Sequence, residues 1–176
     1  MSTGTRILNA ITGLLRPRRR TAASTPASGL PDVSPGGIGP FATVQIAPPP
    51  KAQLRITYAP DQDGDPDAGE IVWTWVPYEE NDGRGKDRPV LVIGRQDAQH
   101  VYAVRLTSKP HSGDQDYLAI GSGPWDSRGR PSWVDIEQIY LVHHDGMRRE
   151  ASALDLDQFV RIANALHRRY GWDAGN

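Results

Sequence analysis

Cysteine is absent from this chain of 176 residues, and long apolar runs are scarce. Without thiols the chain cannot form disulfides, a cysteine-ligated zinc or iron–sulfur site, or a cysteine nucleophile. The apolar pattern within residues 5–16 would give a helix about 20 Å long, which is too short to span a bilayer. The sequence also lacks an HExxH motif, a Gly-rich phosphate loop and a Gly-x-Ser-x-Gly elbow. We therefore disfavour metal hydrolases, P-loop enzymes and serine hydrolases.

Charge of either sign is nearly balanced overall but unevenly distributed. The chain has 20 Lys and Arg against 21 Asp and Glu, a net charge of −1. Residues 1–57 hold seven basic side chains and one acid, a net charge of +6, so residues 58–176 carry −7. A polyanion bound by this acidic part would have to contact a local set of basic side chains rather than a generally basic surface.

The N-terminal part has the composition of a tail. Residues 16–50 consist largely of Pro, Ala, Ser, Thr and Gly around a run of arginines, with too few large apolar side chains to offset the entropy of ordering them. We predict a flexible, disordered tail over residues 1–54, with a short amphipathic helix at 5–16. That segment is either a solvated terminus or a contact to a membrane or RNA. A secretory signal is not expected, because the basic residues follow the apolar run.

Short strands dominate the predicted domain, residues 55–172. Glu70 to Val76 alternates as a β-strand does, and we expect Trp73 and Trp75 to lie in the core. The polar segment from Pro77 to Asp87 predicts a mobile loop, and a second strand begins at Pro89. Further strands are predicted at 100–107, 117–120, 133–136 and 139–142.

A helix closes the predicted domain. Asp155 is a suitable N-cap, Gly171 a suitable C-terminal stop, and Leu156, Phe159 and Val160 begin an apolar face. Strands this short, separated by Gly, Asp and Pro turns, favour a small antiparallel barrel over parallel βαβ units. The fold class is therefore mainly β with one C-terminal α-helix.

Four motifs resemble, in order and spacing, the PemK/MazF family of ribonuclease toxins. They are Gly69-Glu-Ile-Val-Trp73, Gly85-Lys-Asp-Arg-Pro-Val-Leu-Val-Ile93, Leu106-Thr-Ser108 and Ser132-Trp-Val-Asp-Ile-Glu-Gln-Ile139. The resemblance covers about residues 69–170. It implies an SH3-like barrel, a homodimer, a cytoplasmic location, an antitoxin protein as partner, and cleavage of single-stranded RNA without a metal or other cofactor.

The resemblance also implies a reaction and residues for it. In the family the RNA 2′-hydroxyl attacks the adjacent phosphate and leaves a 2′,3′-cyclic phosphate. By position, Arg88 matches the catalytic arginine and Thr107 the catalytic hydroxyl. A guanidinium suits charge developing on phosphate, but its pKa above about 12 makes it a poor general base.

A second group should therefore accept the proton. Family members often carry Glu-Gln ahead of the Gly-x-Arg-Pro step, and this chain departs from that pattern. We predict Asp82 and Glu80 as catalytic carboxylates and leave the base unassigned, since Glu79, Asp87 and His111 are also candidates.

Other polar and aromatic residues around the predicted loops are candidates for binding RNA. Trp125 lies among glycines, where it either stacks on a base or packs in the core, and Ser132 matches a common family serine that is either functional or structural. The predicted substrate-binding set is Arg84, Lys86, Ser108, Lys109, Trp125, Arg128, Arg130 and Ser132.

A second function class stays open at this point. The acidic domain and the altered loop are also compatible with a catalytically inactive SH3-like module that binds nucleic acid or a protein. No recognition helix is evident, so specific DNA binding is not expected except together with an antitoxin. Membrane contact would involve the N-terminal tail alone and is not our expectation.

Overall fold

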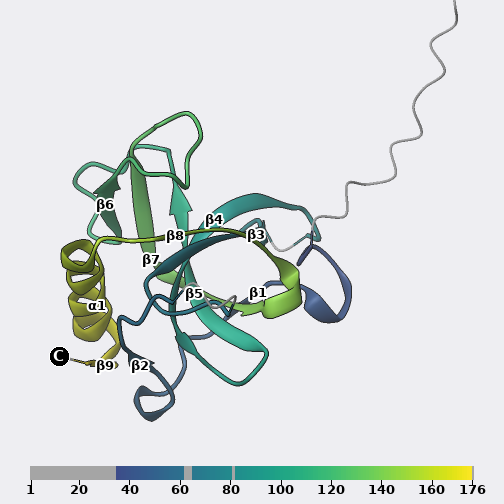
Figure 1. Cartoon of the computed structure of the whole chain (residues 1–176), viewed down its shortest axis with the longest axis horizontal. Helices are drawn as coiled ribbons and strands as arrows, with labels where there is room; N and C mark the ends of the chain where they lie inside the picture. The colour runs from purple at the N-terminus through teal and green to yellow at the C-terminus, as the bar shows by residue number, and fades with distance from the viewer. Residues whose placement is uncertain (1–34, 62–64, 81, 176) are drawn as a thin grey trace, which may run out of the picture. The chain divides into compact units, whose positions relative to one another are not determined.

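The computed structural model describes residues 35–61, 65–80 and 82–175. One α-helix, α1 (Leu156–Tyr170), follows most of the strands in the chain (Figure 1). The described residues also form three 3-10 turns: η1 (Gly39–Phe41) precedes the first strand, whereas η2 (Lys51–Gln53) and η3 (His144–Gly146) connect strands. The strands are β1 (Val44–Ile46), β2 (Arg55–Ile56), β3 (Glu70–Pro77), β4 (Gly85–Arg95), β5 (His100–Thr107), β6 (Tyr117–Gly121), β7 (Ser132–His143), β8 (Met147–Ala153) and β9 (Asp173–Ala174).

One strongly bent antiparallel sheet forms the body of the fold. Its strands pair in the order β1-β7-β5-β4-β3-β8, and β6 pairs with the same edge of β7 as β1. Strands β2 and β9 form a separate parallel pair. Within the described ranges the end strands β1 and β8 do not pair, so the sheet does not close into a complete barrel. The predicted mainly-β fold with a C-terminal helix is confirmed.

The sheet separates two apolar clusters because side chains alternate along each strand. One face carries Val72, Val90 and Ala103 in a cluster contributed by strands alone. The other face carries Ile71 and Leu91, which pack with the helix and with residues from both ends of the described chain. The helix-side cluster includes Leu106 and Trp125, so it reaches the end of β5 that holds Thr107.

Helix α1 begins and ends where the sequence predicts. The Asp155 carboxylate accepts hydrogen bonds from the backbone N–H groups of residues 157 and 158, and Gly171 adopts the left-handed conformation that ends the helix. Phe159 and Leu166 are buried, but Leu156 and Val160 are about half exposed. The sequence predicted both residues on the buried face of the helix. They lie instead at its margin. The described part of the chain contains no helix long and apolar enough to cross a membrane.

The folded region starts earlier than the predicted boundary at residue 55. Strand β1 pairs with β7, Leu54 is buried, and the indole N–H of Trp172 donates to the carbonyl oxygen of Pro49 at 2.9 Å. Isolated apolar residues of this Pro-rich segment, such as Leu54, pack against the rest of the domain. Amino-acid composition alone does not predict such packing. The predicted helix at 5–16 and the first arginine run lie outside the described residues.

Two further strand boundaries differ from prediction. Strand β4 begins at Gly85 rather than Pro89, because β3 extends to Pro77 and pairs with it. A Cβ at Gly85 would lie 2.4 Å from the Trp75 ring, so a glycine permits this close approach. The β3–β4 loop is thus shorter than predicted and comprises residues 78–84. Strand β7 is continuous where two strands were an alternative.

Candidate functional site

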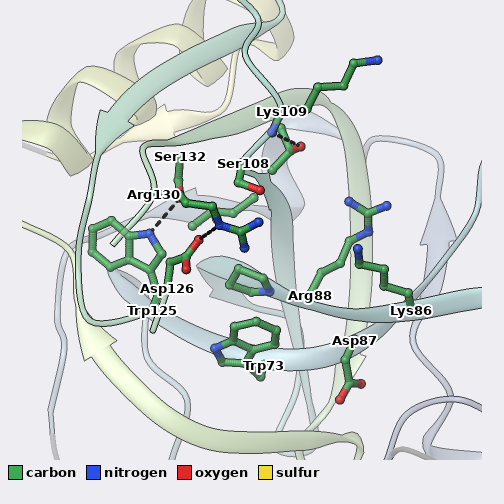
Figure 2. A pocket seen from close by; sticks show the side chains of 13 residues that line it. Trp73, Lys86, Asp87, Arg88, Ser108, Lys109, Trp125, Asp126, Arg130 and Ser132 are labelled. Carbon is green, nitrogen blue, oxygen red and sulfur yellow. Dashed lines mark hydrogen bonds and ion pairs between the residues drawn. The ribbon is translucent and has the colours of Figure 1, made fainter. Parts of the chain in front are cut away.

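The predicted motifs meet in one surface pocket of about 350 Å³ (Figure 2). Arg88 reaches it from β4 and Thr107 from the end of β5. Trp73, Asp87 and Asp126 also line it. The predicted site residues that it brings together are Lys86, Arg88, Thr107, Ser108, Lys109, Trp125, Arg130 and Ser132.

The pairing of β4 with β5 explains why Arg88 and Thr107 come together. Val90 lies opposite Arg105 in this antiparallel pair. Two residues back along β4 is Arg88, and two residues forward along β5 is Thr107, so both reach the same end of the pair. Lys86 shares a face of β4 with Arg88 because side chains alternate. Residues separated widely in sequence are therefore fixed on a rigid element.

The Arg88 guanidinium is available for an anion. Its Nε is buried and has no hydrogen-bond partner among the residues described, although a buried donor is normally satisfied. Asp87, its neighbour, does not pair with it: the Asp87 carboxylate lies 2.5 Å from the Arg148 guanidinium and points away from Arg88 (Figure 2). Since an arginine remains charged, Arg88 places a cation at the pocket wall, and the acid Glu79 interacts with it electrostatically.

The Thr107 hydroxyl is held in place by its own turn. Its Oγ1 accepts a hydrogen bond from the backbone N–H of Lys109 at 3.1 Å. The hydroxyl proton remains free to be donated into the pocket. Ser108 and Lys109 follow directly and also line the pocket. The turn thus places one oriented hydroxyl, followed by the exposed Lys109, in the pocket that Arg88 lines.

Trp125 forms a wall of the pocket rather than a platform for stacking. The residue is 6% exposed, and its Nε1–H donates to Ser132 Oγ at 3.1 Å. A base needs an exposed ring face to stack on, so the stacking alternative for Trp125 does not fit the structure. Ser132 is buried as the acceptor of this bond, which gives it the structural role.

Arg130 is held at the pocket by an acid that sequence reasoning missed. Its Nε lies 2.8 Å from Asp126 Oδ2, and Asp126 Oδ1 accepts the backbone N–H of Arg128 at 2.8 Å. Burial opposes ionisation of Asp126, but the hydrogen bonds from Arg128 and Arg130 outweigh it and lower the pKa. The Arg128 side chain does not line the pocket. The sequence signal for this pair was Asp126, which stands in a predicted turn four residues before Arg130.

Trp73 and Trp75 were expected in the core, and this was wrong. Both are only partly buried, although Ile71 on the same face of β3 is fully buried. The apolar cluster beneath the helix ends at Ile71, so the two indoles continue past it. Trp73 lies opposite Pro89 and lines the pocket, with the Arg148 guanidinium 6.0 Å from its ring centroid.

A second pocket of about 340 Å³ adjoins the first, since Arg88 lines both. Its other lining residues are Tyr78, Glu79, Glu80, Arg84 and Arg105. Glu80 and Arg84 are thus the predicted residues found here. Glu79 is bound to Arg105 at 2.8 Å, and the hydrogen bond and positive charge of Arg105 lower the pKa of Glu79.

The remaining predicted acid–base groups lie outside both pockets. Asp82 accepts from the backbone N–H and from Nε of Arg84, and these bonds lower the pKa of Asp82. Its carboxylate stabilises the turn of the loop instead of facing Arg88. His111 stacks on Tyr117 with ring centroids 3.5 Å apart. The prediction of Asp82 as a catalytic carboxylate therefore does not fit this geometry.

Sequence reasoning also missed the buried pair of Arg105 and Asp135. Arg105 Nε donates to Asp135 Oδ2 at 2.8 Å, and both side chains are buried. The available signal was a charged residue flanked by apolar residues in each of two strands, Arg105 in β5 and Asp135 in β7. Within the described ranges, no cluster of three or more His, Asp or Glu side chains is placed to hold a metal ion.

Comparison with known proteins identifies the family. Residues 67–169 match the family described as the PemK-like, MazF-like toxin of type II toxin–antitoxin systems. Similar solved structures include MazF of Deinococcus radiodurans, 20% identical, with a TM-score of 0.46 and coverage of 61% of this chain and 97% of that one. Toxin MazF-mt6 of Mycobacterium tuberculosis is 16% identical, with a TM-score of 0.42 and coverage of 58% and 98%.

A MazE–MazF structure from Deinococcus radiodurans is 18% identical, with a TM-score of 0.43, and covers 62% of this chain and 98% of that one. No curated protein sequence matches the chain. The family match spans more than half of the chain and includes β3 to β8, which carry both pockets. The chain therefore belongs to the PemK-like, MazF-like toxin family of type II toxin–antitoxin systems.

Proposed function

We propose that this protein is an endoribonuclease that cleaves single-stranded RNA in the pocket lined by Arg88 and Thr107, without a metal ion. The observation that carries the proposal is that Arg88, whose Nε has no hydrogen-bond partner among the described residues, lines one open pocket with an oriented Thr107 hydroxyl. Family membership supplies the chemistry that such a pair would perform. The same pair is positioned by two central strands rather than by loops, which favours catalysis.

The proposed reaction is attack of the ribose 2′-oxygen on the adjacent phosphorus. The bond from 2′-oxygen to phosphorus forms, and the bond from phosphorus to the 5′-oxygen of the next nucleotide breaks. The products are a 2′,3′-cyclic phosphate and a 5′-hydroxyl, whose oxygen takes its proton from solvent water as the bond breaks. Arg88 would stabilise the negative charge that develops on the non-bridging phosphate oxygens. The Thr107 hydroxyl would donate to the same phosphate and fix its orientation.

The reaction also needs a group that takes the 2′-hydroxyl proton, and we propose Glu80. It lines the second pocket together with Arg88, and it interacts electrostatically with Arg84 of the same pocket. Glu79 is a weaker candidate because Arg105 stabilises its charged form. Asp87 is committed to Arg148.

A local set of cations would hold the RNA. Lys86, Lys109 and Arg130 line the pocket with Arg88, and each can reach a backbone phosphate. Three to four such contacts predict that the logarithm of the binding constant falls with the logarithm of salt concentration with a slope of about −2 to −3. A protein antitoxin and a homodimer are further proposals, which rest on the family alone.

The test is cleavage of single-stranded RNA by the purified protein in excess EDTA. We expect fragments that end in a 2′,3′-cyclic phosphate, identified by mass spectrometry. An oligonucleotide with a 2′-deoxyribose at the cleaved position should stay intact, since it lacks the nucleophile. Cleavage of the deoxy substrate would contradict the mechanism. RNA binding without any cleavage would favour a catalytically inactive binding module.

A further inference from the structure

A buried arginine joins the core of the sheet to the loop beside Arg88. Arg105 is 8% exposed and donates through Nε to Asp135 of β7 and through Nη2 to Glu79 of the β3–β4 loop, both at 2.8 Å. The Asp135 side chain is completely buried, whereas that of Glu79 is 62% exposed. The guanidinium thus bridges an interior acid and a surface acid from different elements.

Asp135 alone is sufficient to neutralise the buried charge of Arg105. Its Oδ2 neutralises Arg105, and its Oδ1 accepts the backbone N–H of Glu137 at 2.9 Å. Tyr117 adds a contact of its hydroxyl to Arg105 Nη2 at 3.4 Å. The buried positive charge is therefore already balanced without Glu79. The bond to Glu79 must be explained by what it does for the loop.

Glu79 is held by donors that the sheet itself orients. The hydrogen bond to Asp135 fixes the orientation of the Arg105 guanidinium. A guanidinium binds a carboxylate in a defined geometry, so the position of Glu79 is defined as well. Gln138 of β7 provides a second hydrogen bond to Glu79. The Tyr140 hydroxyl donates to Gln138 Oε1 at 2.6 Å, which leaves the amide nitrogen of Gln138 for Glu79.

Glu79 is followed directly by Glu80, which lines the second pocket with Arg88 and Arg105. The loop closes on itself through the Tyr78 N–H bond to the Arg84 carbonyl oxygen at 2.9 Å and through the Asp82–Arg84 pair. These bonds shape the loop but do not attach it to the sheet beyond its own strands. The bonds of Glu79 to Arg105 of β5 and to Gln138 of β7 provide this attachment.

We propose that Arg105 is a positioning residue, which through Glu79 fixes the β3–β4 loop so that Glu80 faces Arg88. The attachment of the loop follows from the contacts above, and its effect on catalysis rests on the proposed ribonuclease function. Removing Glu79 should therefore release the loop and slow the chemical step, while the pocket that binds RNA on the other side of Arg88 is retained.

The variant Glu79→Ala tests this without disturbing the buried pair, because Glu79 is largely exposed. Asp173→Ala is the matched control, since Asp173 is an exposed acid in an ion pair with Arg55 away from both pockets. The first measurement is native-state cleavage by trypsin after Arg84 and Lys86. We expect about fivefold faster cleavage in Glu79→Ala, because such rates follow the population of the open loop. The control should match the unaltered protein.

The second measurement is steady-state cleavage of RNA. Glu79→Ala should lower kcat about tenfold and change KM by less than twofold, with an unchanged unfolding temperature. Glu79→Gln keeps an oxygen that can accept from Arg105, so both effects should be smaller. Trypsin and kcat values equal to those of the unaltered protein would overturn the proposal. If the unaltered protein cleaves no RNA, the ribonuclease proposal fails, and the trypsin result still decides whether Arg105 holds the loop.

Discussion

The buried Arg105–Asp135 pair gives the sharpest prediction about stability. Asp135→Ala removes the acid that neutralises Arg105 inside the sheet, where Asp135 is 0% and Arg105 8% exposed. Breaking a buried ion pair by removing one partner costs about 3–5 kcal/mol. Because Glu79 still contacts Arg105 Nη2 at 2.8 Å, we expect the lower end, about 3 kcal/mol. The measurement is the free energy of unfolding from urea titrations.

A double-mutant cycle separates the pair from the space it fills. Arg105→Met leaves Asp135 buried without its cation, so this single variant should also lose about 3 kcal/mol. The double variant carries no buried charge at this site, and its loss should be smaller than the sum of the two single losses by about 2 kcal/mol. Additive losses, or a loss below about 1 kcal/mol for Asp135→Ala, would show that the pair is not desolvated as the structure indicates.

Two further predictions concern the pocket wall. Ser132→Ala leaves the buried Trp125 Nε1–H without its acceptor and should lower the free energy of unfolding by about 1–3 kcal/mol, measured in urea; a loss below about 0.5 kcal/mol would contradict this role. The lowered pKa of Asp126 means that its hydrogen bonds from the Arg128 backbone and from Arg130 stabilise the fold fully above the usual carboxyl pKa, near 3.9. This contribution is lost as pH falls through the lowered value. The urea midpoint should therefore fall more steeply below pH 4 in the unaltered protein than in Asp126→Asn, and parallel profiles would refute the assignment.

Much of the strand pattern could be predicted from the sequence. Strand β5 has the predicted bounds, His100–Thr107, because it contains the apolar run 101–104 and is preceded by turn residues. Strand β8, Met147–Ala153, was not predicted, since its sequence is mostly polar and its place in the sheet depends on pairing with β3. Tertiary pairing of this kind is not encoded in local periodicity.

The candidate site was predictable only in part. Arg88 and Thr107 belong to motifs that resemble those of the family, so their presence in one site could be predicted from the sequence. The Arg105–Asp135 contact joins residues 30 positions apart. No local sequence pattern indicates that these two side chains pair. Trp125 was left open between stacking and packing, and the answer depends on whether Ser132 accepts its N–H. Contacts between elements, rather than residue types, decided these cases.

The most direct test of the proposed active site is the rate at which Arg88→Ala cleaves RNA under single-turnover conditions. Arg161→Ala is the control, because Arg161 lies exposed on α1 and outside both pockets. Loss of one preorganised donor to a developing negative charge lowers rates by about 10²–10³-fold. We expect a loss of at least that size for Arg88→Ala at an unchanged unfolding temperature, and the unaltered rate for Arg161→Ala. An Arg88→Ala protein that cleaves within twofold of the unaltered rate would contradict the central claim.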